Sequence, residues 1–261
     1  MSALDIERVR GAFPARRIDY YDSIGSTMTA AIGLPHGSVV VAERQTSGQG
    51  RLGRSWHSEA GNGLYCTVVL APSSTLTLAL GLAARNAIME TTGLCCDIRW
   101  PNDLMLAEKK VAGILVQVVN GRALAGIGIN VNHRSFPPEV GEIATSLALN
   151  MVSPPRHGDT EKECNRDSVS PCLGGENSRE DILIALLRSA DEFAPLDRES
   201  VLRLFTEASS YVCGRRVTVD QPGGQISGVT AGLDEAGFLR LRTDDGADTL
   251  ILAGGVRAAR T

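Results

Sequence analysis

The chain has 261 residues, 43% of them hydrophobic and 21% charged, so it can bury one sizeable core and add a small second domain. Its formal net charge of −4 gives no basic field for general nucleic-acid binding, and we expect no DNA partner. No apolar run approaches the length of a membrane span and the N-terminus lacks a secretory apolar segment, so we expect a cytoplasmic protein without a membrane partner.

The first half of the chain predicts helices and strands in alternation. A short helix is expected over residues 4–13, and Ser26-Thr27 is expected to cap a second helix that ends near residue 32. The alanine- and leucine-rich run Leu76–Thr92 contains no proline and predicts the main core helix. Strands are expected over residues 18–22, 39–43, 64–70, 97–100, 111–119 and 123–131. Asn120-Gly121 predicts a hairpin turn between the last two.

The second half divides into a polar segment, two helices and a strand-rich tail. Residues 150–180 are rich in proline, serine, glycine and charge, which predicts an extended or disordered insert. Helices are expected over 181–193 and 199–209, and strands over 217–220, 225–233, 238–242 and 249–252. We therefore expect an α+β protein with a mixed or antiparallel sheet backed by helices, followed by a small C-terminal β-barrel. The expected domains are residues 1–212 and 213–261.

Residues 45–56, named here the arginine loop, carry the most informative pattern. Gly48, Gly50 and Gly53 give the backbone freedom, and Arg51 and Arg54 place permanent cations in it. Such a segment is suited to folding over phosphate or carboxylate groups. The glycine spacing also matches the dinucleotide fingerprint, but that fingerprint needs a helix directly afterwards, and a strand is expected here.

Two further motifs follow the arginine loop, Arg99-Trp-Pro-Asn-Asp-Leu-Met and Lys109-Lys-Val-Ala-Gly-Ile-Leu-Val-Gln. Together with the loop they resemble the biotin protein ligase family, in its short type without a DNA-binding domain, over about residues 18–260. The resemblance implies an ATP-dependent ligase with an SH3-like C-terminal domain. Biotin and MgATP would form biotinyl-5′-adenylate, and a lysine on the biotin carboxyl carrier domain of a carboxylase would then take the biotinyl group.

The resemblance also implies roles for individual residues. Lys109 and Lys110 begin a strand, so their side chains face opposite ways and only one can enter a pocket. Similarity selects Lys110 as the catalytic cation between the biotin carboxylate and the α-phosphate, and Arg51 as the residue that closes over the adenylate. The implied biotin contacts are Ser26, Thr27, Gln45 and Gly113. The implied nucleotide contacts are Arg51, Arg54, Trp56, Asn102, Asn130 and Arg260, with Asp103 near phosphate or Mg²⁺.

Two positions depart from the family pattern and keep alternatives open. Met28 stands where an asparagine is usual, and Gln49 stands where many relatives carry a further arginine. The alternatives are a lipoate or octanoate ligase of the related fold, and a non-catalytic protein that binds biotin or its adenylate. A homodimer is possible through an expected edge strand near residues 123–131. The histidines show no metal-ligand spacing, and no C-x-x-C pair is present.

Overall fold

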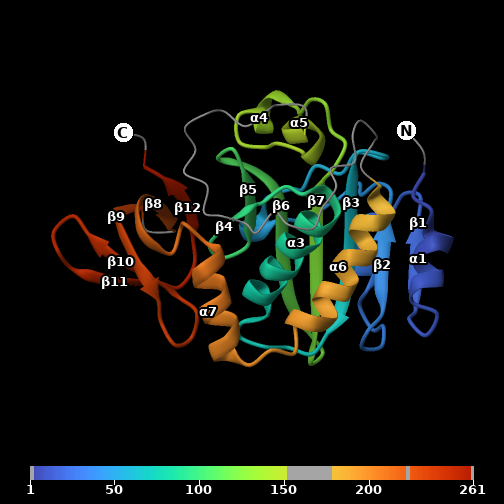
Figure 1. Cartoon of the computed structure of the whole chain (residues 1–261), viewed down its shortest axis with the longest axis horizontal. Helices are drawn as coiled ribbons and strands as arrows, with labels where there is room; N and C mark the ends of the chain where they lie inside the picture. Colours follow the sequence, from blue (N-terminus) through green and yellow to red (C-terminus); the bar gives the residue numbers. More distant parts are fainter. Residues whose placement is uncertain (1–2, 152–177, 222–223, 260–261) are drawn as a thin grey trace.

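A seven-stranded mixed sheet with the strand order β1-β2-β3-β7-β6-β5-β4 forms the larger part of the fold. Figure 1 shows the computed structural model, which describes residues 3–151, 178–221 and 224–259. β1 and β2 run parallel, whereas the other neighbouring strands of this sheet are antiparallel. The strands are β1 Ile18–Tyr21, β2 Val39–Ala42, β3 Gly63–Leu70, β4 Asp97–Arg99, β5 Asp103–Leu106, β6 Lys109–Val119 and β7 Arg122–Asn130. The expected α+β class with a mixed sheet is confirmed.

β7 lies in the interior of this sheet, bonded to β3 on one side and β6 on the other. The expectation of a free edge near residues 123–131 is therefore wrong, and a homodimer has no basis at that strand. The hairpin between β6 and β7 is confirmed, because Val119 pairs with Arg122 around the predicted turn. Asn120 and Gly121 both adopt positive φ, at 50° and 73°, as a tight two-residue hairpin turn requires.

Helices α3 and α6 pack together and cover one face of the large sheet (Figure 1). Alternation along β7 explains this, because Ile127 and Ile129 point into the main core while Gly126 and Gly128 face the other side. The helices are α1 Ile6–Ala12, α2 Thr27–Ala30, α3 Leu76–Thr92, α4 Pro138–Gly141, α5 Leu147–Met151, α6 Arg179–Phe193 and α7 Arg198–Ala208. None of the helices in the described ranges is long and apolar enough to cross a membrane.

The C-terminal strands form a separate five-stranded antiparallel sheet, ordered β11-β10-β9-β8-β12. They are β8 Cys213–Gln221, β9 Gly224–Leu233, β10 Leu239–Thr243, β11 Asp248–Ile251 and β12 Gly255–Ala258. β11 and β12 lie at opposite edges, so closure into an SH3-like barrel stays a prediction. A hydrophobic cluster with Ile98, Phe205 and Val217 joins this sheet to the larger one. Trp100 Nε1 donates to the Gly237 carbonyl at 3.0 Å across the same junction.

Some expectations differ from the structure at short elements. Ser26 stands at the N-cap of α2, but its side chain makes no capping hydrogen bond, and the helix ends at Ala30. The strands β5 and β12 and the short helices α4 and α5 were not predicted. Most of the polar insert expected over 150–180 lies outside the described residues.

Candidate functional site

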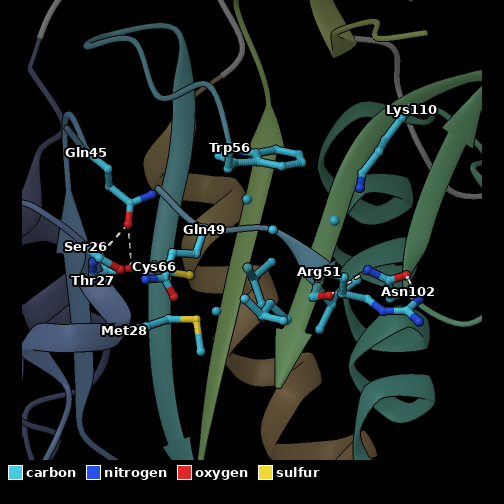
Figure 2. A pocket seen from close by; sticks show the side chains of 17 residues that line it. Ser26, Thr27, Met28, Gln45, Gln49, Arg51, Trp56, Cys66, Asn102 and Lys110 are labelled. Atoms are coloured by element: carbon cyan, nitrogen blue, oxygen red, sulfur yellow. Dashed lines mark hydrogen bonds between the residues drawn. The ribbon is translucent and has the colours of Figure 1, made fainter. Parts of the chain in front are cut away.

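A pocket lies on the face of the large sheet opposite α3 and α6, beneath the arginine loop (Figure 2). As folded it is a cavity of about 40 Å³, whereas ligand pockets commonly measure roughly 300–1,000 Å³. Gln49 and Arg51 of the arginine loop are among the residues that line it. Because these side chains come from a loop, displacement of the arginine loop is the direct way to admit a larger ligand.

Gly113, Gly126 and Gly128 of β6 and β7 form the base of the pocket, named here the glycine floor. A Cβ atom at Gly128 would lie 2.5 Å from the Trp56 indole, and one at Gly126 would lie 2.9 Å from the Met28 sulfur. Only glycine allows these side chains to approach the sheet so closely. The glycines at 126 and 128 were missed, although glycine at every second strand position predicts one bare face.

Thr27 and Gln45 are linked at one wall of the pocket. Gln45 Oε1 accepts hydrogen bonds from the Thr27 backbone nitrogen at 2.9 Å and the Thr27 hydroxyl at 3.1 Å. Gln45 Nε2 donates to the Ser58 hydroxyl at 3.1 Å, and Thr67 donates to the Thr27 hydroxyl at 2.8 Å. The neighbouring Ser26 hydroxyl is buried and finds no partner among the described residues. This wall therefore presents fixed polar groups and one hydroxyl with unused hydrogen-bonding capacity.

Lys110 reaches the pocket from the start of β6, while the adjacent Lys109 is exposed, as strand alternation predicts. Lys110 Nζ lies 2.5 Å from Asp103 Oδ1 and 5.2 Å from the centre of the Trp56 ring. The other Asp103 oxygen lies 2.7 Å from Arg99 Nη2. Burial alone would raise the pKa of Asp103, but the charges of Lys110 and Arg99 outweigh it and hold that pKa below its ordinary value. Asp103 thus stays ionised between two cations.

Arg51 fastens the arginine loop to the turn that precedes β5. Its Nη1 donates to Asn102 Oδ1 at 2.8 Å, and Asn102 Nδ2 donates to the Ile114 carbonyl at 2.8 Å (Figure 2). Burial lowers the pKa of the Arg51 guanidinium; the Asp103 charge opposes this and the Arg54 charge adds to it. The guanidinium nevertheless remains protonated, so Arg51 is a partly desolvated cation among the residues that line the pocket.

The structure does not bring every predicted residue into the pocket. Asn130 ends β7, where its amide donates to the Thr145 carbonyl at 3.0 Å, and it does not line the pocket. Arg54 is exposed and extends toward Gly255 of the C-terminal sheet. If Gly255 carried a side chain, its Cβ atom would lie 4.0 Å from Arg54 Nη2. Arg260 lies outside the described residues. Sequence reasoning also missed Arg99, whose pairing with Asp103 depends on the register of β4 with β5.

Known family profiles match both parts of the chain. Residues 22–133 match the biotin/lipoate A/B protein ligase family, and residues 212–256 match the biotin protein ligase C-terminal domain. The first range contains the arginine loop, the glycine floor and Lys110, and the second covers most of the C-terminal sheet.

Individual proteins show the same likeness over nearly the whole chain. The bifunctional ligase/repressor BirA of Bacillus subtilis is 31% identical over 87% of this chain and 70% of its own length. The biotin–[acetyl-CoA-carboxylase] ligase of Mycobacterium tuberculosis is 30% identical over 92% of this chain and 88% of its own. A solved biotin protein ligase of Aquifex aeolicus, in complex with biotin and ATP, superposes with a TM-score of 0.76 and is 28% identical. That match covers 93% of this chain and 99% of the Aquifex chain.

Proposed function

Because this chain belongs to the biotin protein ligase family, we propose that the pocket beneath the arginine loop is where it performs the family reaction. In this proposal the protein acts as a biotin protein ligase that activates biotin with ATP and transfers it to a carboxylase. The observation that carries the site is that Arg51 of the arginine loop meets Asn102 and Lys110, from a distant part of the sequence, at one pocket. The acceptor we propose is a lysine of the carboxylase's biotin carboxyl carrier domain.

In the first step, a biotin carboxylate oxygen attacks the α-phosphorus of ATP and pyrophosphate leaves. Two anions must approach each other, so a cation between them lowers the barrier. Lys110 is suited to this role because its ammonium lies at the pocket edge, only partly exposed and oriented by Asp103. When the Lys110 ammonium moves from the Asp103 carboxylate to the reacting oxygens, it exchanges one anionic partner for another.

In the second step, the acceptor amine attacks the acyl carbon of biotinyl-adenylate, the acyl–oxygen bond to phosphate breaks, and AMP leaves. The amine loses a proton as the amide forms. The adenylate hydrolyses if water reaches it, so it must stay covered until the acceptor arrives. The hydrogen bond from Arg51 to Asn102 supports a covering role for the arginine loop.

The wall formed by Ser26, Thr27 and Gln45 suits the ureido head of biotin, which offers one acceptor and two donors. The unpartnered Ser26 hydroxyl supports this assignment, because a ligand would supply its missing hydrogen bond. Gly113 would let the ligand lie along β6, and Trp56 would pack on adenine. Roles for Asn130 and Arg54 stay predictions, since neither lines the pocket, and the role of Arg260 stays a prediction because that residue lies outside the described range.

Asp103 does not fit the role of a magnesium ligand as it is arranged, since one carboxylate oxygen faces Lys110 and the other faces Arg99. Mg²⁺ prefers oxygen ligands that are not already shared with cations. In this proposal Mg²⁺ accompanies ATP as the counter-ion of its phosphates, without an assigned side chain.

We further propose residues 213–261 as an SH3-like C-terminal domain beside a catalytic domain of residues 1–212. The profile match over residues 212–256 and the separate antiparallel sheet support this division. The expected cytoplasmic location stays a prediction. The C-terminal match and the names of the relatives favour biotin over lipoate as the substrate.

Pyrophosphate exchange into ATP tests the proposal, with purified protein, Mg²⁺ and biotin, lipoate or octanoate supplied separately. Exchange that depends on biotin alone is the expected result. Exchange driven by lipoate or octanoate would assign the chain to the sister activity. Binding of biotin without any exchange would identify a non-catalytic binder and would point to Met28 and Gln49 as the cause.

A further inference from the structure

Three residues that the proposed reaction does not use lie together beside the pocket. One potential ligand atom from each of His57, Glu59 and His133 lies within 4.8 Å of the others. His57 and Glu59 are exposed, whereas His133 is only 1% exposed. The first two lie just after the arginine loop and the third lies just after β7, so only the fold brings them together.

His133 is the unusual member of this cluster. Both of its ring nitrogens are buried and find no hydrogen-bond partner among the described residues, although buried polar groups are normally paired. Its ring stacks on Phe136 with centroids 4.9 Å apart and an interplanar angle of 15°, and its centroid lies 6.1 Å from that of His57. A buried imidazole held by stacking, with both nitrogens unused, is preorganised to accept a ligand.

We propose that His57, Glu59 and His133 form a binding site for a divalent transition-metal ion of the zinc class. Two imidazole nitrogens and one carboxylate oxygen make a donor set that zinc accepts readily, with water completing the coordination. Bonds of about 2.0–2.2 Å to the ion require the ligand atoms to move closer together. The exposed side chains of His57 and Glu59 can make that movement while His133 stays fixed.

An ion at this site would join the segment leaving the arginine loop to the segment leaving β7. His57 follows Trp56 directly, so the ion would restrain the end of the loop that carries this tryptophan. The site is distinct from any Mg²⁺ that accompanies ATP, because Mg²⁺ prefers oxygen ligands and binds imidazole poorly.

Metal binding by the purified full chain, freed of metal by chelation and kept without ATP, tests this proposal. Zn²⁺ affinity is measured by competition with a chromophoric chelator, and Co²⁺ is added as a spectroscopic probe. We expect one equivalent of Zn²⁺, retained in millimolar Mg²⁺, and visible Co²⁺ bands typical of low coordination number. His57→Ala and Glu59→Gln should each weaken Zn²⁺ binding by at least about tenfold.

His36→Ala is the matched control, because His36 is an exposed histidine outside the cluster, and it should bind Zn²⁺ like the parent protein. The two ligand variants change exposed side chains, so they should fold normally; thermal unfolding checks this. Failure to bind one equivalent, or unchanged affinity in the His57→Ala/Glu59→Gln double variant, would overturn the proposal. So would a near-ultraviolet Co²⁺–thiolate band, which would place the ion on a cysteine.

Discussion

At the scale of single residues, Lys110 and Lys109 form a natural comparison. They are adjacent, but Lys110 meets Asp103 and Trp56 at the pocket, whereas Lys109 is exposed and its Nζ lies 3.3 Å from the Gly141 carbonyl. Strand alternation alone predicts that the two side chains separate in this way. The choice of Lys110 as the functional member came from family resemblance and stays a prediction until it is tested.

Lys110→Ala should lower biotin-dependent pyrophosphate exchange by about 10²–10³-fold, the usual cost of removing one preorganised electrostatic group from a reaction site. Lys109→Ala, the control, should keep exchange within about twofold. Lys109→Ala should retain the thermal unfolding midpoint of the parent, and Lys110→Ala should stay folded with a lowered midpoint, because Asp103 loses one of its two cations but keeps Arg99. Near-parental exchange by Lys110→Ala would remove the assigned role.

Gly128→Ala should impair the site without unfolding the protein. The new Cβ would lie 2.5 Å from the Trp56 indole, so the ring must leave the glycine floor. We expect the KM for ATP to rise roughly tenfold or more, since one stacked aromatic contact to a base contributes about 1–3 kcal/mol. Gly11→Ala is the control, because nothing lies within 4 Å of a Cβ there. An unchanged KM for ATP would contradict the assigned role of Trp56.

Residue types and their order predicted part of this site, and the fold supplied the rest. Thr27, Gln45, Arg51 and Asn102 were assigned through the family resemblance that the motifs carry, and they do line the pocket. The cluster that includes His133 could not be predicted, because His133 lies more than seventy positions after His57 and Glu59 and shares no spacing pattern with them. Whether a buried side chain such as His133 finds a hydrogen-bond partner depends on three-dimensional packing. Sequence periodicity carries no information about that packing.

At the scale of elements, the arginine loop carries two arginines with different surroundings. Arg51 is partly buried and bonded to Asn102, whereas Arg54 is exposed and directed toward the C-terminal sheet. The loop sequence predicted cations over the pocket, but it could not separate these two positions. Their separation depends on the short 3₁₀ turn Arg51–Gly53, which was not predicted.

Arg51→Ala should loosen the cover over the intermediate. We expect it to release free biotinyl-adenylate and to label lysines on bystander proteins, because the reactive anhydride escapes before the acceptor binds. Arg54→Ala should release much less, since Arg54 does not line the pocket. The measurement is biotinylation of added serum albumin, detected by streptavidin blotting. Equal labelling by the two variants would contradict the proposed division of roles.

The longest element was predicted with its bounds, whereas some of the short elements were missed. The run Leu76–Thr92 forms α3 with the predicted bounds, because seventeen residues give a clear apolar pattern. β5 and β12 have four residues each. β5 was also missed because the turn at Pro101, just before it, was read as continuing through Asp103. The hydrophobic pattern of a strand does not determine its neighbours in the sheet, so β7 was predicted at an edge although it lies in the interior.

At the scale of the whole molecule, one buried ion pair ties distant segments together. Arg179, at the start of α6, donates to both oxygens of Glu43, at 2.7 and 3.1 Å. Glu43 also accepts from the Leu4 backbone nitrogen at 2.6 Å and the Tyr20 hydroxyl at 3.1 Å. Both charged side chains are less than a tenth exposed. The pair therefore anchors the N-terminal segment and α6 at the end of β2.

Arg179→Met should destabilise the protein by about 3–5 kcal/mol at neutral pH, because it leaves a buried carboxylate without its cation. Arg203→Met, which removes an exposed pair with Glu207, should cost less than about 1 kcal/mol. Urea unfolding measures both changes. A cost for Arg179→Met no larger than that for Arg203→Met would contradict an anchoring role.

The difference in unfolding free energy between the parent and Arg179→Met should depend on pH in a defined direction. Burial would raise the pKa of Glu43, but the hydrogen bonds and charge of Arg179, with Leu4 and Tyr20, lower it overall. A lowered folded-state pKa gives stability that is complete above the ordinary glutamate pKa of about 4.3 and is lost as the pH falls through the folded value. The urea midpoints of the parent and Arg179→Met should therefore converge below about pH 4. A constant gap from pH 7 to pH 3 would contradict this account.

The glycine floor also limits how the acid specificity of this pocket can be redesigned. Because the floor offers only main chain, a side chain added there meets Trp56, Lys110 or Met28 before it meets a ligand. Room for longer or bulkier acids has to come from the walls, at positions such as Met28 and Leu115. A mutant library selected for new acids should therefore return altered wall residues above an unchanged floor.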